Sequence, residues 1–231
     1  MKTSRIVNLR FEGTAIDALL KGLWLILTTI PIVTTAWGMV PFYRWFNNNT
    51  VTSDGRRFSL EGRPANVWLL MAGFTLANFV RGLAQGAAQQ ETSDQFDPAT
   101  ILLGFGLFII VQLFTWGILK WYISHTRLDD TIALRFRGGA IPFIGWMILS
   151  IISIFTIIGW AWVNAAIIRW VLRNIDAPNM TFVFTGRGHE VLWRSLVALL
   201  GSIFIVTIPW VWLWLTKWFV ASTHIECDQI S

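Results

Sequence analysis

Long apolar runs alternate along the chain with short polar stretches that end in phenylalanine and glycine. These stretches end at residues 11–13, 58–62, 136–138 and 184–186. Each is followed by an apolar run that closes on a basic residue next to a tryptophan. The separation from glycine to tryptophan is 32 residues in units one, three and four (13 to 45, 138 to 170 and 186 to 218) and 59 in unit two (62 to 121). Equal spacings of this length indicate an internal repeat of four units.

The extra residues of unit two indicate what every unit contains. They form a polar segment, residues 81–100, which divides the apolar run into a helix at about 66–80 and a second helix. The second helix is predicted to begin at Asp97 and Pro98, a capping residue followed by proline at the first helical position. In the other units, Pro, Gly and Thr predict tight turns near 31–38, 157–160 and 207–210. The resulting arms of about 15 residues are short, because a membrane span needs roughly 20.

The distribution of basic residues distinguishes helical hairpins from single spans. With hairpins, all linkers between units lie on one side of the membrane and hold 17 of the 18 Lys and Arg residues. Arg81 alone lies on the other side, beside Glu91, Asp94 and Asp97. Single spans would divide the charges about evenly, whereas cytoplasmic segments normally carry the excess. We therefore predict an all-α polytopic membrane protein of four tandem helical-hairpin repeats, with about eight membrane helices, some short or re-entrant, linked by short cytoplasmic β-hairpins.

Composition and domain organisation agree with this prediction. Of 231 residues, 55% are hydrophobic and only 31 are charged (18 basic and 13 acidic), whereas about a quarter of a soluble protein is charged. A single cysteine, Cys227, cannot form an internal disulfide. We expect one membrane domain, 1–231, with repeats at about 6–49, 50–125, 126–174 and 175–228. Its expected location is the bacterial inner (plasma) membrane, multi-pass, with both termini cytoplasmic and no cleaved signal peptide.

The linkers contain β-prone segments around two-residue turns at 54–55, 129–130 and 178–179, which predict β-hairpins. Residues 6–11 resemble the outgoing strand of such a hairpin, and residues 222–227 resemble the incoming strand. We expect the two ends of the chain to pair as a fourth hairpin. This pairing would close the repeats into a pseudo-fourfold ring on the cytoplasmic face.

Three linker motifs carry a family resemblance. Residues 47–62 (NNNTVTSDGRRFSLEG), 124–138 (SHTRLDDTIALRFRG) and 184–190 (FTGRGHE) resemble signatures of the YjgN-like family of bacterial inner-membrane proteins of unknown function. The resemblance extends over nearly the whole chain and implies an inner-membrane protein with cytoplasmic linkers. It supplies no catalytic residues. The chain departs from the pattern at Asp130, where a turn glycine is expected, and at 174–179.

The basic–tryptophan pairs are the predicted interfacial anchors, because indole rings prefer the headgroup level of a bilayer. Fifteen tryptophans occur in the chain. The anchor pairs are Arg44 with Trp45, Lys120 with Trp121, Arg169 with Trp170, and Lys217 with Trp218.

A candidate polar site combines units one and four. Asp17 and Lys21 follow the first motif glycine by four and eight residues, and Glu190 and Arg194 repeat these offsets. Each pair would lie on one helix face, where the carboxylates could coordinate a cation or relay a proton at the cytoplasmic entrance. The alternative is an acid in the first helical turn, favoured by the helix dipole, with a basic partner that extends to the interface.

Deep polar residues are few, and Asn78, Gln112 and Asn164 are the candidates to line a cavity. They suit hydrogen bonding between packed helices equally well. His125, Asn49 and Asn174 follow their tryptophans by four residues and His224 by six, so a ring of these side chains could bind a metal or a headgroup. Their spacing fits no metal motif, which favours ordinary hydrogen bonding and no metal.

The functional prediction follows from these patterns. No nucleotide, protease, esterase, haem or CxxC motif is present, so we expect neither an enzyme nor a cofactor. We predict a non-enzymatic scaffold or subunit that binds anionic membrane lipid on the cytoplasmic side, or a membrane-protein partner, and no nucleic acid. The alternative is a small-solute transporter or channel with its path between the pseudo-symmetric repeats.

Overall fold

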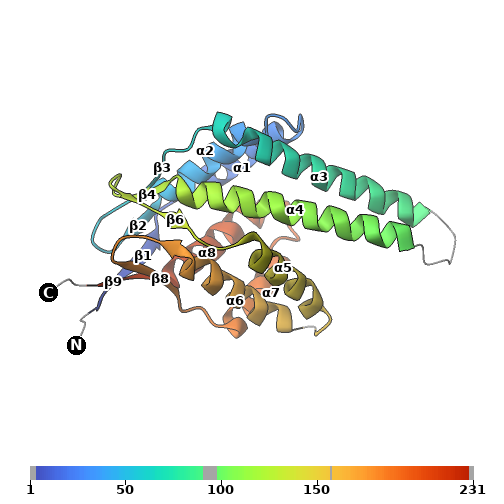
Figure 1. Cartoon of the computed structure of the whole chain (residues 1–231). Coiled ribbons are helices and arrows are strands. Elements are labelled where there is room, and N and C mark those ends of the chain that lie inside the picture. Colours follow the sequence, from blue (N-terminus) through green and yellow to red (C-terminus); the bar gives the residue numbers. More distant parts are fainter. Residues whose placement is uncertain (1–3, 91–97, 157, 229–231) are drawn as a thin grey trace.

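The computed structural model of the protein describes residues 4–90, 98–156 and 158–228. In this part of the chain eight α-helices follow one another in four antiparallel pairs (Figure 1). Consecutive helices contact each other, and the last contacts the first. The helices are α1 (Ala15–Thr29), α2 (Thr35–Asn48), α3 (Pro64–Gln90), α4 (Pro98–Ser124), α5 (Ala140–Ile154), α6 (Gly159–Arg173), α7 (Gly188–Gly201) and α8 (Ile208–Ala221).

The strands of the described residues gather at one end of the helices, where Figure 1 also places both chain ends. They form sheets in the orders β2-β1-β9-β8, β3-β4-β5 and β6-β7. The strands are β1 (Ser4–Phe11), β2 (Thr50–Thr52), β3 (Phe58–Leu60), β4 (Thr126–Leu128), β5 (Ile132–Ala133), β6 (Arg135–Phe136), β7 (Ile175–Asp176), β8 (Met180–Phe184) and β9 (Thr223–Asp228).

The predicted pairing of the two chain ends is confirmed. Strand β1 runs antiparallel to β9, with Ile6 opposite Glu226 and Val7 opposite Ile225. Single bridges, Val51 with Arg57 and Ala177 with Met180, connect the three sheets across the turns after β2 and β7. Together with the continuation of β5 into β6, these contacts close the strands into a ring.

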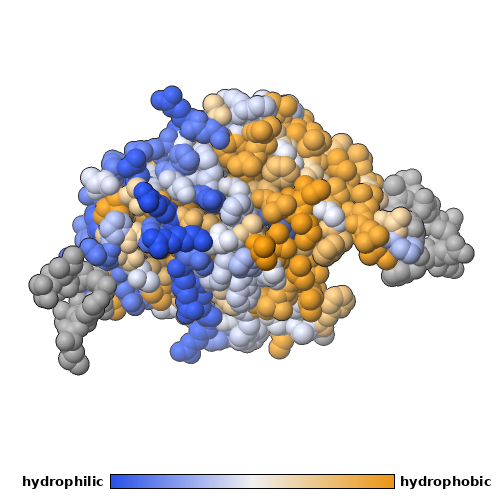
Figure 2. All heavy atoms as spheres, viewed as in Figure 1, coloured by the Kyte–Doolittle hydropathy of each residue, from blue (hydrophilic) through white to orange (hydrophobic). Residues whose placement is uncertain are grey.

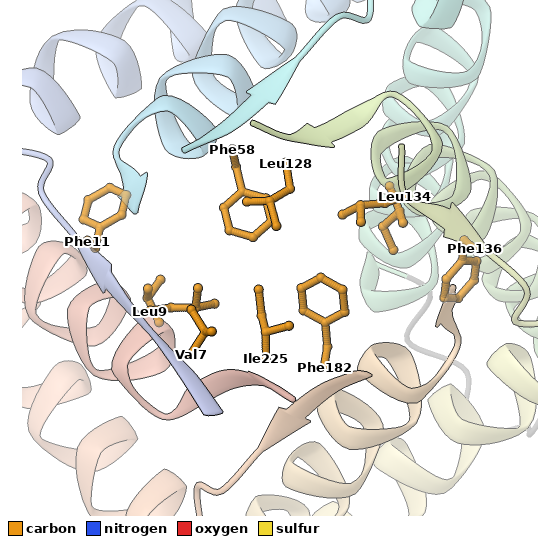
Figure 3. Close-up of a cluster of buried hydrophobic side chains, with 11 residues drawn as sticks. Val7, Leu9, Phe11, Phe58, Leu128, Leu134, Phe136, Phe182 and Ile225 are labelled. Carbon is orange, nitrogen blue, oxygen red and sulfur yellow. The ribbon is translucent and has the colours of Figure 1, made fainter. Parts of the chain in front are cut away.

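The inside of this ring is the main hydrophobic core. Figure 3 shows side chains from strands of all four units pointing toward a common centre. Residues four positions before each motif glycine are buried there: Leu9, Phe58, Leu134 and Phe182. Because side chains alternate across a strand, the residues two positions before each glycine are buried as well: Phe11, Leu60, Phe136 and Phe184.

The predicted turns overlap the observed ones but lie too late in the sequence: of the predicted ranges 31–38, 157–160 and 207–210, residues 35–38, 159–160 and 208–210 already belong to α2, α6 and α8. The chain reverses between α1 and α2 at 30–34, between α5 and α6 at 155–158, and between α7 and α8 at 202–207. Helix α4 begins at Pro98 as predicted, although the expected cap Asp97 lies outside the described residues. In the linker turns, Asp129 and Asp130 have φ of 56° and 54°, the left-handed values that a two-residue hairpin requires.

The predicted fold class is wrong in the number of membrane helices. Among the described residues, only α3 and α4 are long and apolar enough to cross a membrane, over Pro64–Gly86 and Pro98–Ser124. Each other helix has 14 or 15 residues and is therefore about 21–23 Å long, less than the roughly 30 Å of a hydrocarbon core. Eight membrane helices are thus excluded by length.

The all-α assignment and the linker hairpins also need correction. Among the described residues, only β4 and β5 pair as a local hairpin, with Leu128 opposite Ile132. The strands around 54–55 and 178–179 share single bridges with each other. Of these strands, β2, β3 and β7 pair with strands of neighbouring units, and β8 pairs with β9 at the other end of unit four. Helix α3 also continues through most of the predicted polar loop, to Gln90. The polar end is therefore a set of sheets in which pairing between units is combined with pairing between the two ends of a unit.

Candidate functional site

Aromatic rings cover each of the four motif glycines. A Cβ atom at Gly13 would come within 2.5 Å of Phe11 Cε1 and 2.9 Å of Trp45 Cζ2, so only the hydrogen of glycine fits. The same close approach recurs at Gly62 with Trp121, at Gly138 with Phe136 and Trp170, and at Gly186 with Phe184. In the three units with a spacing of 32 residues, the phenylalanine before the glycine meets the tryptophan edge-on, as Phe11 with Trp45, Phe136 with Trp170 and Phe184 with Trp218. The equal spacing therefore reflects one aromatic contact that these three units share.

Two of the predicted anchors connect one unit to the next. Arg44 donates from Nη2 to the carbonyl oxygen of Gly62 at 3.0 Å and from Nε to that of Leu60 at 3.3 Å. In the same way, Arg169 donates to the Gly186 carbonyl oxygen at 2.7 Å. Each arginine thus holds the glycine of the following unit. Lateral hydrogen bonding of this kind was not predicted from the sequence.

The lysine pairs differ from the arginine pairs. Between units two and three, Trp116 Nε1 donates to the Gly138 carbonyl oxygen at 2.9 Å. Lys120 is exposed and lies 5.0 Å from the centre of the Trp116 ring. Lys217 is exposed and forms no hydrogen bond with the Gly13 carbonyl group. Within the described residues, the contact between units four and one therefore lacks a hydrogen bond to the motif-glycine carbonyl group, which the other three contacts between units contain.

The tryptophans of the anchor pairs are held mainly by packing. Trp121 is buried, and Trp45, Trp170 and Trp218 are half-buried. The indole nitrogens of Trp45 and Trp121 are enclosed and have no hydrogen-bond partner among the described residues. Their role as interfacial anchors stays a prediction.

The residues four positions after the tryptophans cap helix ends. Asn49 and Asn174 donate from Nδ2 to the carbonyl oxygens of Trp45 and Trp170, at 2.8 and 2.7 Å. His125 Nδ1 lies 2.8 Å from the Trp121 carbonyl oxygen. Each of these carbonyl oxygens also accepts the backbone N–H of the same residue, at 3.1–3.2 Å, so the side chain adds a second contact at the helix C-terminus. These contacts favour the ordinary hydrogen-bonding interpretation, and no group of three or more potential metal ligands occurs among the described residues.

The candidate polar site is not assembled in the expected way. Asp17 accepts from Thr14 Oγ1 at 2.7 Å, while the Asp17 backbone N–H donates to the same hydroxyl oxygen. Glu190 accepts from the backbone N–H of Arg187 at 3.2 Å. Neither acid forms an ion pair with Lys21 or Arg194 in the part of the chain that the structure describes. The Thr14 hydroxyl group caps the N-terminus of α1 and donates to Asp17, whereas the Glu190 carboxylate itself accepts a backbone N–H at the start of α7. Both acids lie in the first helical turn, as the dipole alternative predicts.

Arg194 instead lies among tryptophan rings. Its guanidinium carbon is 4.5 Å from the ring centres of Trp193 and Trp218 and 5.8 Å from that of Trp214. Its Nε atom is buried without a hydrogen-bond partner among the described residues. Cation–π attraction therefore takes the place of the expected ion pair. The spacing of these tryptophans on α7 and α8 could have indicated a cation–π site, which was not predicted from the sequence.

The candidate cavity-lining residues are not brought together. Asn78 donates from Nδ2 to the Phe74 carbonyl oxygen of its own helix at 2.9 Å. Gln112 and Asn164 are half-buried on α4 and α6, and no hydrogen bond joins any two of the three residues. They also line neither of the two cavities described below.

A small cavity of about 120 Å³ lies inside the strand ring and receives side chains from all four units. Its lining is apolar except around Asn47, which donates to Thr126 Oγ1 at 3.1 Å and accepts from the Tyr122 hydroxyl group. Equivalent positions in the other units hold Ile123, Leu172 and Val220. The centre of the ring is therefore mainly hydrocarbon.

The outer surface of the helices is strongly apolar. Leu69 on α3, Leu102 on α4 and Leu199 on α7 are 68%, 71% and 69% exposed. In the most apolar windows of α3 and α4 only 17% and 6% of the residues are buried, unlike the core helix of a soluble protein. Figure 2 shows hydrophobic residues over the helical part and hydrophilic residues toward the strand end. A contiguous apolar surface of this extent is typical of contact with lipid or another protein.

Charged residues cluster at the opposite end. The described residues include Arg81 and 16 other Lys and Arg residues. These 16 all lie in the strands, in their turns, or in the two helical turns next to them, and the same regions hold ten Asp and Glu residues. This leaves an excess of six basic residues. Ion pairs use part of the charge, for example Arg127 with Glu61 at 2.5 Å and Arg137 with Asp176 at 2.6 Å. Arg63, Arg173 and Arg187 are exposed, and no ion pair uses their side chains within the described residues.

Comparison of the chain with protein-family models, curated proteins and solved structures gave no match. The assignment of a function therefore rests on the amphipathic geometry of the molecule: an apolar helical part, a basic strand end, and tryptophans where the two meet.

Proposed function

We propose that the protein is a non-enzymatic inner-membrane scaffold that binds anionic lipid headgroups through its strand end. The observation that carries the proposal is the separation of the apolar helical surface from the basic strand end along the molecule (Figure 2). Exposed apolar surface is stabilised by hydrocarbon, and basic residues just outside the hydrocarbon attract anionic lipid at about 1 kcal/mol each.

The proposed placement in the membrane follows from helix length. Helices α3 and α4 cross the bilayer as one hairpin, and the six shorter helices enter only the leaflet next to the strand ring. Both chain ends lie at the ring, because β1 pairs with β9. The basic excess at this end favours the cytoplasmic side under the positive-inside rule, in agreement with the resemblance to YjgN-like proteins.

No specific observation favours the alternative function, a transporter or channel between the units. The cavity between the units is small and mainly apolar, and the deep amide side chains are not assembled around it.

The test uses purified protein reconstituted into vesicles of phosphatidylethanolamine with or without phosphatidylglycerol. We expect retention in membranes after alkaline extraction, and a preference for phosphatidylglycerol measured by lipid analysis of the protein after extraction in mild detergent. Replacing Arg63, Arg173 and Arg187 together by Gln should weaken this preference, whereas Arg81→Gln should not. Release by alkali, or an equal effect of the two variants, would refute the proposal.

A further inference from the structure

We propose that a groove between α1, α2 and α8 binds one acyl chain of an anionic phospholipid. This inference rests on the proposed function, since the lipid would enter from the membrane. The groove has a volume of about 530 Å³, within the usual range for small-molecule sites. Its wall is hydrocarbon and aromatic apart from one hydroxyl group, that of Thr216. The lining includes Gly22, Leu23 and Ile26 of α1, Phe42 of α2, and Trp212 and Thr216 of α8.

The groove lies where units four and one meet, between α8 and α1. Between units one and two, Ala36, Val40 and Met71 belong to a tightly packed cluster. A second cluster, with Ala161, Ala165 and others, fills the space between units three and four. At the contact between α8 and α1, the Gly13 carbonyl group lacks the bond from a neighbouring unit that the other three motif glycines receive. The contact between units four and one therefore contains an open groove that another molecule can occupy.

The occupant is identified first by the surroundings of the groove. Leu23, Ile26 and Trp212 line it and are 50%, 63% and 57% exposed. These residues continue the outer apolar surface into the groove, so a hydrocarbon chain can enter from lipid without crossing a polar barrier. The volume is also about that of a single turn of an α-helix 10–12 Å across. The groove is therefore too small for a partner helix and suits a flexible chain.

Two lysines next to residues that line the groove select the headgroup. Lys21 precedes Gly22 on α1, and Lys217 follows Thr216 on α8. Neither lysine forms an ion pair in the described part of the chain, and Asp17, one turn before Lys21, already accepts a hydrogen bond from Thr14. Lys217 lies near the strand end of α8, and Lys21 lies near the middle of α1, so the headgroup is placed beside the groove and not beyond its end. A phosphate beside them would direct the acyl chain along the groove toward the helix tips.

The glycine at position 22 allows a direct test. A Cβ atom at Gly22 would meet no heavy atom within 4 Å, so Gly22→Phe places a ring in the groove without displacing the backbone. Gly145 on α5 is equally open and lies outside the groove, which makes Gly145→Phe the matched control. The protein is equilibrated with vesicles of equal parts phosphatidylglycerol and phosphatidylethanolamine, extracted in mild detergent, and analysed by native mass spectrometry.

We expect the wild type and Gly145→Phe to retain one phospholipid, and Gly22→Phe to retain it about tenfold less, as the loss of two buried methylene contacts implies. Replacing Lys21 and Lys217 together by Gln should remove the preference for phosphatidylglycerol while a lipid is still retained. Equal retention by Gly22→Phe and the wild type would overturn the groove proposal, as would retention of free fatty acid alone.

Failure of the groove and failure of the scaffold are distinguishable. A wild type that stays in the membrane after alkaline extraction but retains no phospholipid contradicts only the groove. Release of the wild type from membranes by alkali contradicts the proposed function itself.

Discussion

The guanidinium group of Arg44, at the end of the first helix pair, donates to the carbonyl oxygen of Gly62, at the start of the second, at 3.0 Å. Gly62 in turn lies under the ring of Trp121. A residue predicted as a membrane anchor is thereby also a structural link between neighbouring units.

Removing this link should destabilise the fold. We expect Arg44→Gln to lower the free energy of unfolding by about 1 kcal/mol. The expected effect is small for a hydrogen bond from a charged donor because Arg44 is exposed to solvent. Lys217→Gln is the control, because Lys217 occupies the equivalent position without the bond. Reversible unfolding in detergent micelles, followed by tryptophan fluorescence, measures both. Equal effects of the two substitutions would contradict the link.

The close contact between glycine and aromatic rings predicts a strong effect of one methyl group. A Cβ atom at Gly138 would approach Phe136 Cζ to 2.5 Å and Trp170 Cη2 to 2.9 Å. Gly138→Ala should therefore cost about 1–3 kcal/mol of stability, as expected for overpacking. Gly145→Ala, in the open part of α5, should be neutral or stabilising by up to about 1 kcal/mol. The same unfolding assay tests the pair, and a neutral Gly138→Ala would show that the rings move aside.

The pairing of β1 with β9 predicts different effects for a buried and an exposed isoleucine on these two strands. Ile225 on β9 is completely buried, whereas Ile6 on β1 is 60% exposed. Ile225→Ala should lower the free energy of unfolding by about 2–5 kcal/mol because it leaves a cavity in the core. Ile6→Ala should change it by no more than about 0.5 kcal/mol. If Ile225→Ala were equally mild, the terminal strands would not contribute to the core.

The turn after β2 predicts a pH effect. A hydrogen-bonded ion pair with Arg56, at 2.7 Å, lowers the pKa of the Asp54 carboxyl group from 3.8 to about 2. Because the folded pKa lies below the unfolded pKa, the stabilisation is present above about pH 4 and is lost as the pH falls through about 2. Arg56→Gln should return the pKa toward 3.8, as measured by NMR titration of the carboxyl carbon.

Arg57→Gln serves as the control for this titration, because Arg57 binds Glu12 and the Asn48 carbonyl oxygen instead of Asp54. A pKa of Asp54 that rises equally in both variants would contradict the specific pair.

Local sequence patterns predicted the local parts of the structure. Pro98 marks the start of α4, and the turns between paired helices overlap the predicted ranges, although each begins earlier in the sequence. The equal glycine–tryptophan spacings of units one, three and four correspond to one repeated phenylalanine–tryptophan contact. The pairing of the two chain ends was also predictable, since each end resembles half of a linker hairpin.

Contacts between units were not predictable in the same way. A strand pattern does not specify its partner, so local hairpins were predicted where Phe58 instead lies opposite Leu128 of another unit. The link from Arg44 to Gly62 and the tryptophan contacts of Arg194 depend on how helices pack in three dimensions. The shortness of six helices was already indicated by the spacing, which leaves about 15 residues for each arm, below the roughly 20 of a membrane span.

The most direct test of the central claim measures whether the exposed helical surface faces lipid. Single cysteines at positions 53, 102 and 199, introduced in a Cys227→Ser background, carry a spin label in protein reconstituted into phosphatidylglycerol vesicles. At positions 102 and 199, where Leu102 and Leu199 are strongly exposed, collisions with oxygen should exceed those with a water-soluble nickel complex. The reverse should hold at position 53 in the ring. Water-like accessibility at positions 102 and 199 would contradict the account.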